Sequence, residues 1–159
     1  MSKAIVTTLS YIKNNDQLVL ALKKRGFGVG KWNGYGGKIV EGETIEESAI
    51  REVKEEAEIE VTQIENRGVI DFSWDNEKNL PIEIHVYEII AYNGELVETE
   101  EMKPQNFKID NLPFAEMWDA DKHWLPLFLA GKYFKGRFIL NDDDKVVEYS
   151  IEEIKKPLN

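Results

Sequence analysis

The chain has 159 residues, of which 42% are hydrophobic and 31% are charged, a balance typical of one folded domain with a hydrophobic core. Its net charge of −10 argues against a nucleic-acid polymer as partner, because such polymers bind basic surfaces. The absence of cysteine excludes disulfide and thiolate chemistry. No segment has the pattern of a secretory signal or approaches the roughly 18 apolar residues of a membrane span. We therefore expect a single domain over residues 1–159 that is monomeric, cytoplasmic and without a membrane partner.

The first part of the chain predicts a β-hairpin followed by a glycine-rich loop. Residues 4–12 and 17–23 are rich in apolar residues and flank the polar turn 13–16, a pattern typical of two paired strands. Seven of the eleven glycines lie between Gly26 and Gly42. This density indicates a loop that adopts special backbone dihedral angles or approaches a ligand closely.

Residues 44–59 predict the first helix. Thr44 and Glu47 have the spacing of a capping box, in which each side chain bonds to the other residue's backbone N–H. Apolar residues recur every four positions and predict the stripe that faces the core. These residues are Ile45, Ala49, Val53 and Ala57.

The second half of the chain predicts four strands and a further helix. In chain order we expect strands at 61–73 and 81–92, an acidic loop at 93–104, a helix at 120–130 and a hairpin of Tyr133–Leu140 and Lys145–Ile151. Pro126 would shorten or kink the second helix. The order of elements indicates one α+β domain, with helices packed against a mixed sheet.

Three carboxylates share one side of the predicted first helix. At about 100° per residue, Glu52, Glu55 and Glu56 fall within one sector of the helix surface. Like charges four positions apart repel each other, so helix stability alone does not favour this cluster. Mg²⁺ prefers oxygen ligands and commonly bridges carboxylates to phosphates. Beside a glycine-rich loop, the cluster indicates metal-assisted phosphate chemistry, with a solvated acidic face as the structural alternative.

Arg51 lies next to this acidic side. Its guanidinium can hold a carboxylate through two parallel hydrogen bonds and so orient it. Arg51 can equally be a surface partner of Glu47 or Glu55. The sequence leaves both interpretations open.

The spacing of these residues resembles the Nudix box. The chain reads Gly37-x5-Glu43-x7-Arg51-Glu52-Val53-x-Glu55-Glu56-x2-Ile59. Glu58 stands where the family usually has glycine, and we expect it to lengthen the helix or strain its end. The resemblance implies the Nudix fold, an α/β/α sandwich around a mixed β-sheet.

The same resemblance implies a metal-dependent hydrolase. It implies Mg²⁺ as cofactor, with Mn²⁺ as an alternative. Matching positions make Gly36, through its carbonyl, and Glu52, Glu55 and Glu56 the metal ligands. With Arg51, the three carboxylates form the expected catalytic set, in which a carboxylate or a metal-bound hydroxide activates the attacking water.

Segments outside the box resemble one branch of the family, the oxidised purine nucleoside triphosphatases. These segments are residues 22–38, 100–104, 113–118 and 124–127. The resemblance implies that 8-oxo-dGTP, with 2-hydroxy-dATP as a further candidate, is cleaved to its monophosphate and pyrophosphate. Such a reaction sanitises the nucleotide pool and avoids DNA damage.

Matching positions also assign a substrate pocket. Asn33 and Asp121 would hydrogen-bond to the base edge, and Trp118 would stack on the base. The remaining pocket residues would be Thr8, Lys23, Phe27, Gly37, Lys38 and Phe72. Glu101 matches an additional carboxylate that binds metal or handles water.

These residues have structural interpretations as well. Trp118 can belong to the core, Asn33 can occupy a turn, and Asp119 or Asp121 can cap the second helix. Ala120 stands where the branch has aspartate, so we expect a retained activity with altered base preference. The rival functions are a Nudix hydrolase of dinucleoside polyphosphates, ADP-ribose or unmodified triphosphates, and a non-catalytic nucleotide-binding module.

Overall fold

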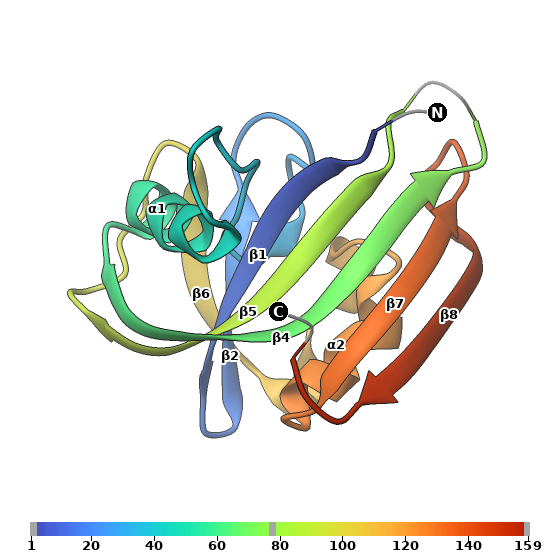
Figure 1. Cartoon of the computed structure of the whole chain (residues 1–159). Coiled ribbons are helices and arrows are strands. Elements are labelled where there is room, and N and C mark those ends of the chain that lie inside the picture. Colours follow the sequence, from blue (N-terminus) through green and yellow to red (C-terminus); the bar gives the residue numbers. More distant parts are fainter. Residues whose placement is uncertain (1–2, 77–78, 158–159) are drawn as a thin grey trace.

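The computed structural model describes residues 3–76 and 79–157, and within them eight strands form one sheet with two α-helices (Figure 1). The strands are β1 (Ile5–Asn14), β2 (Gln17–Lys23), β3 (Trp32–Asn33), β4 (Glu60–Trp74), β5 (Ile82–Asn93), β6 (Met102–Lys108), β7 (Tyr133–Leu140) and β8 (Val146–Ile154). The helices are α1 (Ile45–Ala57) and α2 (Asp121–Leu129), with short 3-10 turns at Ile109–Asn111 and Phe114–Glu116.

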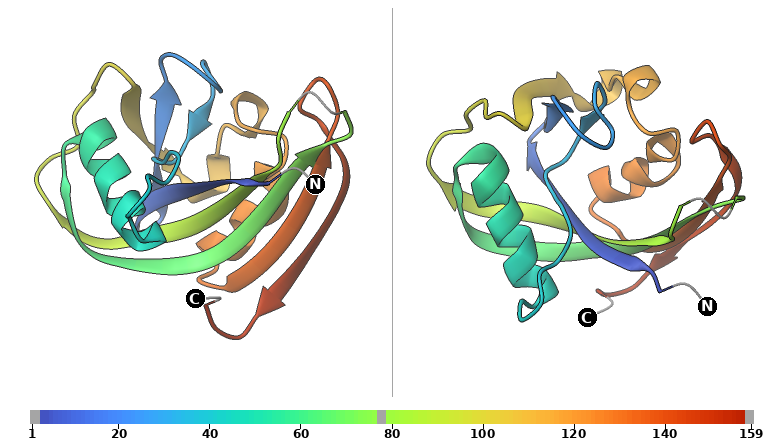
Figure 2. Two further views of the ribbon diagram at one scale, coloured as in Figure 1. Left: turned by 45° about the horizontal axis from the view of Figure 1, so that its top comes forward. Right: turned by 90° about the horizontal axis from the view of Figure 1, so that it is seen from above.

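The sheet is mixed, as expected. Its strand order is β3-β2-β1-β5-β4-β7-β8. β1 and β3 pair with different parts of β2, and β6 pairs with β2 along its whole length. The pairs β1–β5 and β4–β7 are parallel, and the remaining pairs are antiparallel. β1 pairs with β5 along residues 5–11 but with β2 only along residues 12–14, so the sheet turns sharply at β1 (Figure 2).

The two helices pack on opposite faces of the sheet. Side chains alternate between faces along a strand. On β1, Leu9 and Tyr11 join the core cluster that contains Trp124 and Phe128 of α2. The next residue, Ile12, joins the cluster that contains residues of α1. The expected α/β/α sandwich is therefore confirmed.

No helix in the described part of the chain is long and apolar enough to cross a membrane.

Helix α1 begins and ends as its local sequence directs. Thr44 accepts a hydrogen bond from the Glu47 backbone, and the Glu47 side chain accepts one from the Thr44 backbone, which confirms the capping box. Ala49, Val53 and Ala57 are fully buried. Glu58 ends the helix with φ 58°, a left-handed conformation that favours glycine. The expected strain at this position is therefore present.

Two strands were not expected from the sequence. The predicted loop at 93–104 is wrong for its last residues, because β6 begins at Met102 and pairs with β2 along its whole length. The sequence does not predict this strand, because it contains mostly polar residues and Pro104 and lacks an alternating apolar pattern. β3 lies inside the glycine-rich segment and pairs with Ala21 and Leu22.

The start of α2 also differs from the expectation. Its N-cap residue is Ala120, and no side chain caps the helix. Asp119 instead accepts hydrogen bonds from the Val146 backbone at 2.9 Å and from Lys122 at 3.0 Å. The carboxylate expected as a cap therefore ties the helix start to β8.

Candidate active site

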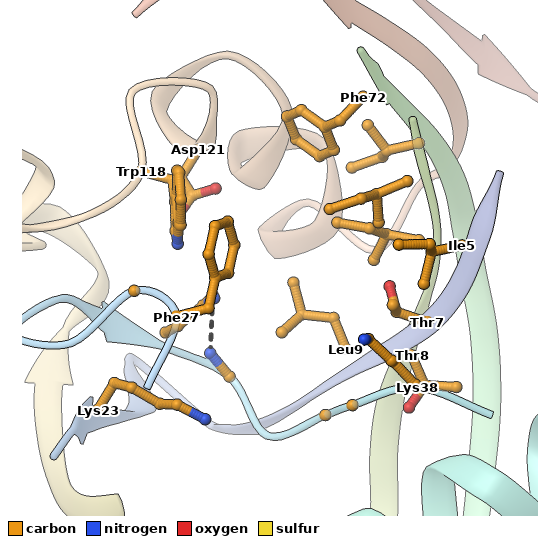
Figure 3. A pocket seen from close by; sticks show the side chains of 18 of the residues that line it. Ile5, Thr7, Thr8, Leu9, Lys23, Phe27, Lys38, Phe72, Trp118 and Asp121 are labelled. Carbon is orange, nitrogen blue, oxygen red and sulfur yellow. Dashed lines mark hydrogen bonds between the residues drawn. The ribbon is translucent and has the colours of Figure 1, made fainter. Parts of the chain in front are cut away.

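A cavity of about 530 Å³ lies between β1, the glycine-rich segment and the start of α2 (Figure 3). Every residue assigned to the substrate pocket lines it: Thr8, Lys23, Phe27, Asn33, Gly37, Lys38, Phe72, Trp118 and Asp121. Gly36 and Glu56 line it too, whereas Arg51, Glu52, Glu55 and Glu101 do not. In Figure 3, Phe27, Trp118 and Asp121 lie on one side of the cavity, across from Phe72 and Ile5. The fold thus gathers residues from distant segments around one space.

Arg51 is bonded to three carboxylates beside the cavity. Its Nε and Nη2 donate to the two oxygens of Glu43 at 2.6 and 3.1 Å. Its Nη1 donates to Glu52 at 2.8 Å and to Glu55 at 3.2 Å. The bonds from Arg51 lower the pKa of Glu43 and keep that carboxylate ionised. Arg51 is therefore both an orienter of Glu52 and a partner of Glu55, while Glu47 is engaged in the capping box.

Glu56 is the buried member of the carboxylate cluster, with an exposed fraction of 5%. Its Oε1 accepts a hydrogen bond from the Gly36 N–H at 2.9 Å, and its Oε2 lies 4.0 Å from the Lys23 ammonium. Burial raises the pKa of Glu56 to about 7, although the Gly36 bond and Lys23 oppose the rise. A carboxyl group that titrates near neutrality is suited to accept a proton during catalysis.

The Gly36–Gly37 segment runs against these carboxylates. A Cβ at Gly37 would lie 2.5 Å from the Glu52 carboxylate. A Cβ at Gly36 would lie 1.8 Å from the Thr8 carbonyl oxygen on β1. Only glycine fits such close approaches. The backbone of the segment therefore lies between β1 and the acidic side of α1, with Glu52 and Glu56 beside it.

The carboxylate cluster suits a metal ion in its chemistry, but its side chains are turned to other partners. Within residues 3–76 and 79–157, no three carboxylate or imidazole side chains converge closely enough to hold an ion. Glu52 and Glu55 are bonded to Arg51, and Glu56 is bonded to the Gly36 N–H. The atoms available to a metal ion here are carboxylate and carbonyl oxygens, the ligands preferred by hard divalent cations. The oxygens expected to hold the metal are thus close neighbours without a formed coordination site.

Aromatic side chains form the opposite end of the cavity. Trp118 is only partly buried and stacks on Phe27, with ring centroids 5.1 Å apart and an interplanar angle of 29°. The Lys31 ammonium lies 5.3 Å from the Trp118 ring centroid, a cation–π contact that the sequence did not suggest. Gly28 approaches the same indole, since a Cβ there would lie 3.4 Å from it. Trp118 is therefore a cavity residue, and the interpretation that it belongs to the core is wrong.

Asp121 places a buried carboxyl group at this aromatic end. Its exposed fraction is 3%, and its Oδ1 accepts a hydrogen bond from Trp124 Nε1 at 3.1 Å. Its Oδ2 is buried without a hydrogen-bond partner among the described residues. Burial raises the pKa of Asp121 to about 7. Ala120 is also buried, but it packs in the core cluster and does not line the cavity.

Asn33 lies in strand β3, and the interpretation that it is only a turn residue is wrong. Its Oδ1 accepts hydrogen bonds from the Gly34 N–H at 2.9 Å and from the Tyr11 hydroxyl at 2.8 Å. The sequence does not indicate this role of Tyr11, because an aromatic residue in an apolar strand has the same pattern whether it makes a polar contact or only packs in the core.

Glu101 lies outside the cavity, on the other side of Lys23. Its carboxylate is 3.5 Å from the Lys23 ammonium and 2.7 Å from Arg25. The hydrogen bond from Arg25 lowers the pKa of Glu101, with a further contribution from Lys23. Lys23 therefore connects Glu101 with the buried Glu56 at the cavity wall.

Comparison with known proteins agrees with this geometry. The mouse (Mus musculus) protein named oxidized purine nucleoside triphosphate hydrolase is 40% identical over 97% of this chain and 98% of its own length. The zebrafish (Danio rerio) protein of the same name is 42% identical over 93% of this chain and 94% of its own. The crystal structure of a MutT protein from Bacillus halodurans shares the fold, with a TM-score of 0.79, 24% identity and coverage of 93% and 97% of the two chains. The NUDIX domain model matches residues 3–128, and the chain therefore belongs to the Nudix family.

Proposed function

We propose that this protein is a Mg²⁺-dependent pyrophosphohydrolase that converts oxidised purine nucleoside triphosphates, 8-oxo-dGTP foremost, to the monophosphate and pyrophosphate. The strongest support is one continuous cavity, which is lined by Glu56 and the Gly36–Gly37 backbone as well as by Trp118 and Asp121. A single nucleotide could then place its phosphates at the carboxylates and its base at the aromatic end. The names of the mouse and zebrafish relatives agree with this substrate class.

The aromatic end supplies the groups that a modified base requires. A stacked ring contributes roughly 1–3 kcal/mol per base by analogy with single-strand binders. Asp121 Oδ2 accepts a hydrogen bond when ionised and donates one when protonated, and Asn33 contributes its amide. A site built to hydrogen-bond a base edge rejects analogues that leave these polar groups unpaired.

The carboxylate end supplies the groups for phosphate cleavage. Lys23 and Lys38 line the cavity and offer positive charge to the phosphates. Mg²⁺, held by Glu52, Glu55, Glu56 and the Gly36 carbonyl, would neutralise phosphate charge and acidify water, with Mn²⁺ as an alternative. One of these carboxylates would accept the proton of the attacking water. Arg51 would hold Glu52 in place, and Glu101 would contribute through Lys23.

Pyrophosphate release tests the proposal. The panel is 8-oxo-dGTP, 2-hydroxy-dATP, dGTP, dATP, diadenosine tetraphosphate and ADP-ribose, each with Mg²⁺. We expect kcat/KM for an oxidised purine to exceed that of its normal counterpart by at least about tenfold, as one or two specific hydrogen bonds provide. Equal rates on normal and oxidised purines, or faster cleavage of a dinucleotide, would favour the other Nudix hydrolases. A wild-type protein that binds these nucleotides without turnover would be a non-catalytic module.

We also propose that base preference depends on position 120, although Ala120 itself packs in the core cluster and does not line the cavity. Ala120→Asp restores the carboxyl group of the branch beside Asp121, and we expect the ratio of rates for 8-oxo-dGTP and 2-hydroxy-dATP to change. Because Ala120 is 1% exposed, the free energy of unfolding of the variant must be measured alongside. An unchanged ratio in a folded variant would show that position 120 does not influence the base.

We also propose that the protein acts as a monomeric single domain in the cytoplasm. Its acidic charge supports a small nucleotide substrate in place of a nucleic-acid polymer. Light scattering of the purified chain would test the oligomeric state.

A further inference from the structure

Tyr11 lies directly behind the aromatic end of the cavity without lining it. It is fully buried on β1, and its ring packs against Trp124 and Phe128 of α2, with centroid distances of 5.8 and 5.4 Å. Its hydroxyl reaches Asn33 Oδ1 at 2.8 Å. A buried side chain that the proposed mechanism does not use therefore contacts a residue assigned to the base.

The hydrogen bonds around Asn33 determine which way its amide points. The Gly34 backbone N–H lies 2.9 Å from one amide atom of Asn33, and a backbone N–H can only donate, so this atom is the oxygen. The Tyr11 hydroxyl faces the same oxygen and must therefore donate to it. Burial, with the charge of Asp121, raises the pKa of Tyr11, so that the hydroxyl keeps its proton.

This arrangement uses both lone pairs of the Asn33 oxygen. An amide has one oxygen with two lone pairs and one nitrogen with two N–H donors. With the oxygen engaged by Tyr11 and Gly34, Asn33 has only N–H donors left for a ligand. A base edge placed against it must then present an acceptor.

Gly34 leaves the space that the Tyr11 ring occupies. A Cβ at Gly34 would lie 3.0 Å from two ring carbons of Tyr11 and 2.6 Å from the Ser10 carbonyl oxygen. A side chain there would displace the ring or the strand. The position of Tyr11 is therefore supported from α2 on one side and by the missing side chain of Gly34 on the other.

We propose that Tyr11 is a positioning residue for base recognition, which locks Asn33 as a donor-only group and so selects bases with an acceptor at that edge. The proposal rests on the proposed function, since it assumes that a purine base occupies the aromatic end. It adds a residue that does not touch the substrate, and it gives Asn33 a defined polarity.

Tyr11→Phe is the direct test. The ring keeps its packing, and Asn33 Oδ1 still accepts from Gly34, so no buried polar group loses its last partner. We expect KM for 8-oxo-dGTP to rise about 3–10-fold, as loss of one orienting hydrogen bond predicts, with kcat changed less than about twofold. Tyr87→Phe is the matched control, because Tyr87 is a buried tyrosine on β5 that does not line the cavity. Its KM should match that of the wild type, and an unchanged KM in Tyr11→Phe would overturn the proposal.

A double-mutant cycle separates positioning from general packing. Asn33→Ala should raise KM, and adding Tyr11→Phe to it should change KM by less than about twofold, because the two residues act through one interaction. Additive effects would show that Tyr11 acts by packing and would overturn the proposal. Asn33→Asp replaces both donors by an acceptor and should raise KM at least as much as Asn33→Ala.

A measurement without substrate separates this proposal from the proposed function. In the NMR spectrum of the free protein, the Asn33 side-chain NH₂ signals, assigned by their loss in Asn33→Ala, should shift in Tyr11→Phe and not in Tyr87→Phe. Unmoved signals would overturn the role of Tyr11 even if the enzyme cleaves 8-oxo-dGTP. If the signals shift in Tyr11→Phe but the wild type shows no preference for oxidised purines, the proposed function is refuted. The orientation of Asn33 by Tyr11 is then still supported.

Discussion

Asp121 should make the stability of this protein depend on pH in the neutral range. Its carboxyl group is buried, its Oδ2 has no hydrogen-bond partner among the described residues, and burial raises its pKa to about 7 from an ordinary value of 3.8. Asp121→Asn keeps an oxygen for the Trp124 Nε1 donor and replaces Oδ2 by an NH₂ group. The variant therefore resembles the protonated wild-type side chain at every pH.

The expected magnitude follows from the two pKa values. Because the folded pKa lies above the unfolded one, the stability contributed by protonated Asp121 is complete below about pH 3.8 and is lost as pH rises to about 7. Within this window, each pH unit removes at most about 1.36 kcal/mol. Between pH 5 and pH 7 the wild type should therefore lose about 1–3 kcal/mol relative to Asp121→Asn, and little more above pH 7.

Denaturant unfolding of both proteins at pH 5, 6, 7 and 8 measures this difference. Glu56 also has a pKa of about 7 and adds its own pH dependence, but both proteins contain it, so its contribution cancels in the comparison. Curves of unfolding free energy against pH that run parallel for the two proteins would refute the reasoning. So would a greater loss of stability in the variant as pH rises.

Three further substitutions probe the helix and its carboxylates. Glu56→Gln should abolish pyrophosphate release, while circular dichroism shows a retained fold. Mg²⁺ should raise the Tm of the wild type more than the Tm of this variant, because the ion binds the folded state and Glu56 is one of its expected ligands. Gly37→Ala should lower kcat at least about tenfold, since the new Cβ would lie 2.5 Å from the Glu52 carboxylate. If the variant has the kcat of the wild type, the Gly36–Gly37 backbone or the Glu52 side chain shifts to make room. Glu58→Gly should raise the free energy of unfolding by up to about 1 kcal/mol in denaturant titration. Glycine adopts the left-handed conformation at φ 58° without the steric strain that the Glu58 side chain causes. A lower stability of this last variant would mean that chain entropy outweighs the strain.

The sequence alone determined the features that depend on neighbours along the chain. The capping box joins residues three positions apart, and the buried stripe of α1 follows from the helical repeat, so both could be predicted. The two hairpins followed from apolar runs around polar turns. The resemblance to the Nudix box rests on residue spacing in the same way. The helical repeat, independently of this resemblance, predicted that Glu52, Glu55 and Glu56 share one side of α1. In the structure Arg51 contacts both Glu52 and Glu55.

Only the tertiary structure decided how distant segments meet. The parallel pairing of β1 with β5 and the strand β6 depend on partners far along the chain, and their own residues carry no signal for it. Arg51 could be an orienter or a surface partner by its sequence neighbours, and only the folded loop brings Glu43 to its guanidinium. Tyr11 and Asn33 are 22 positions apart, and their hydrogen bond exists because β2 and β3 return the chain to β1. Hydrogen bonding and burial act through space, so the polarity of Asn33 and the raised pKa of Asp121 arise only in the folded chain.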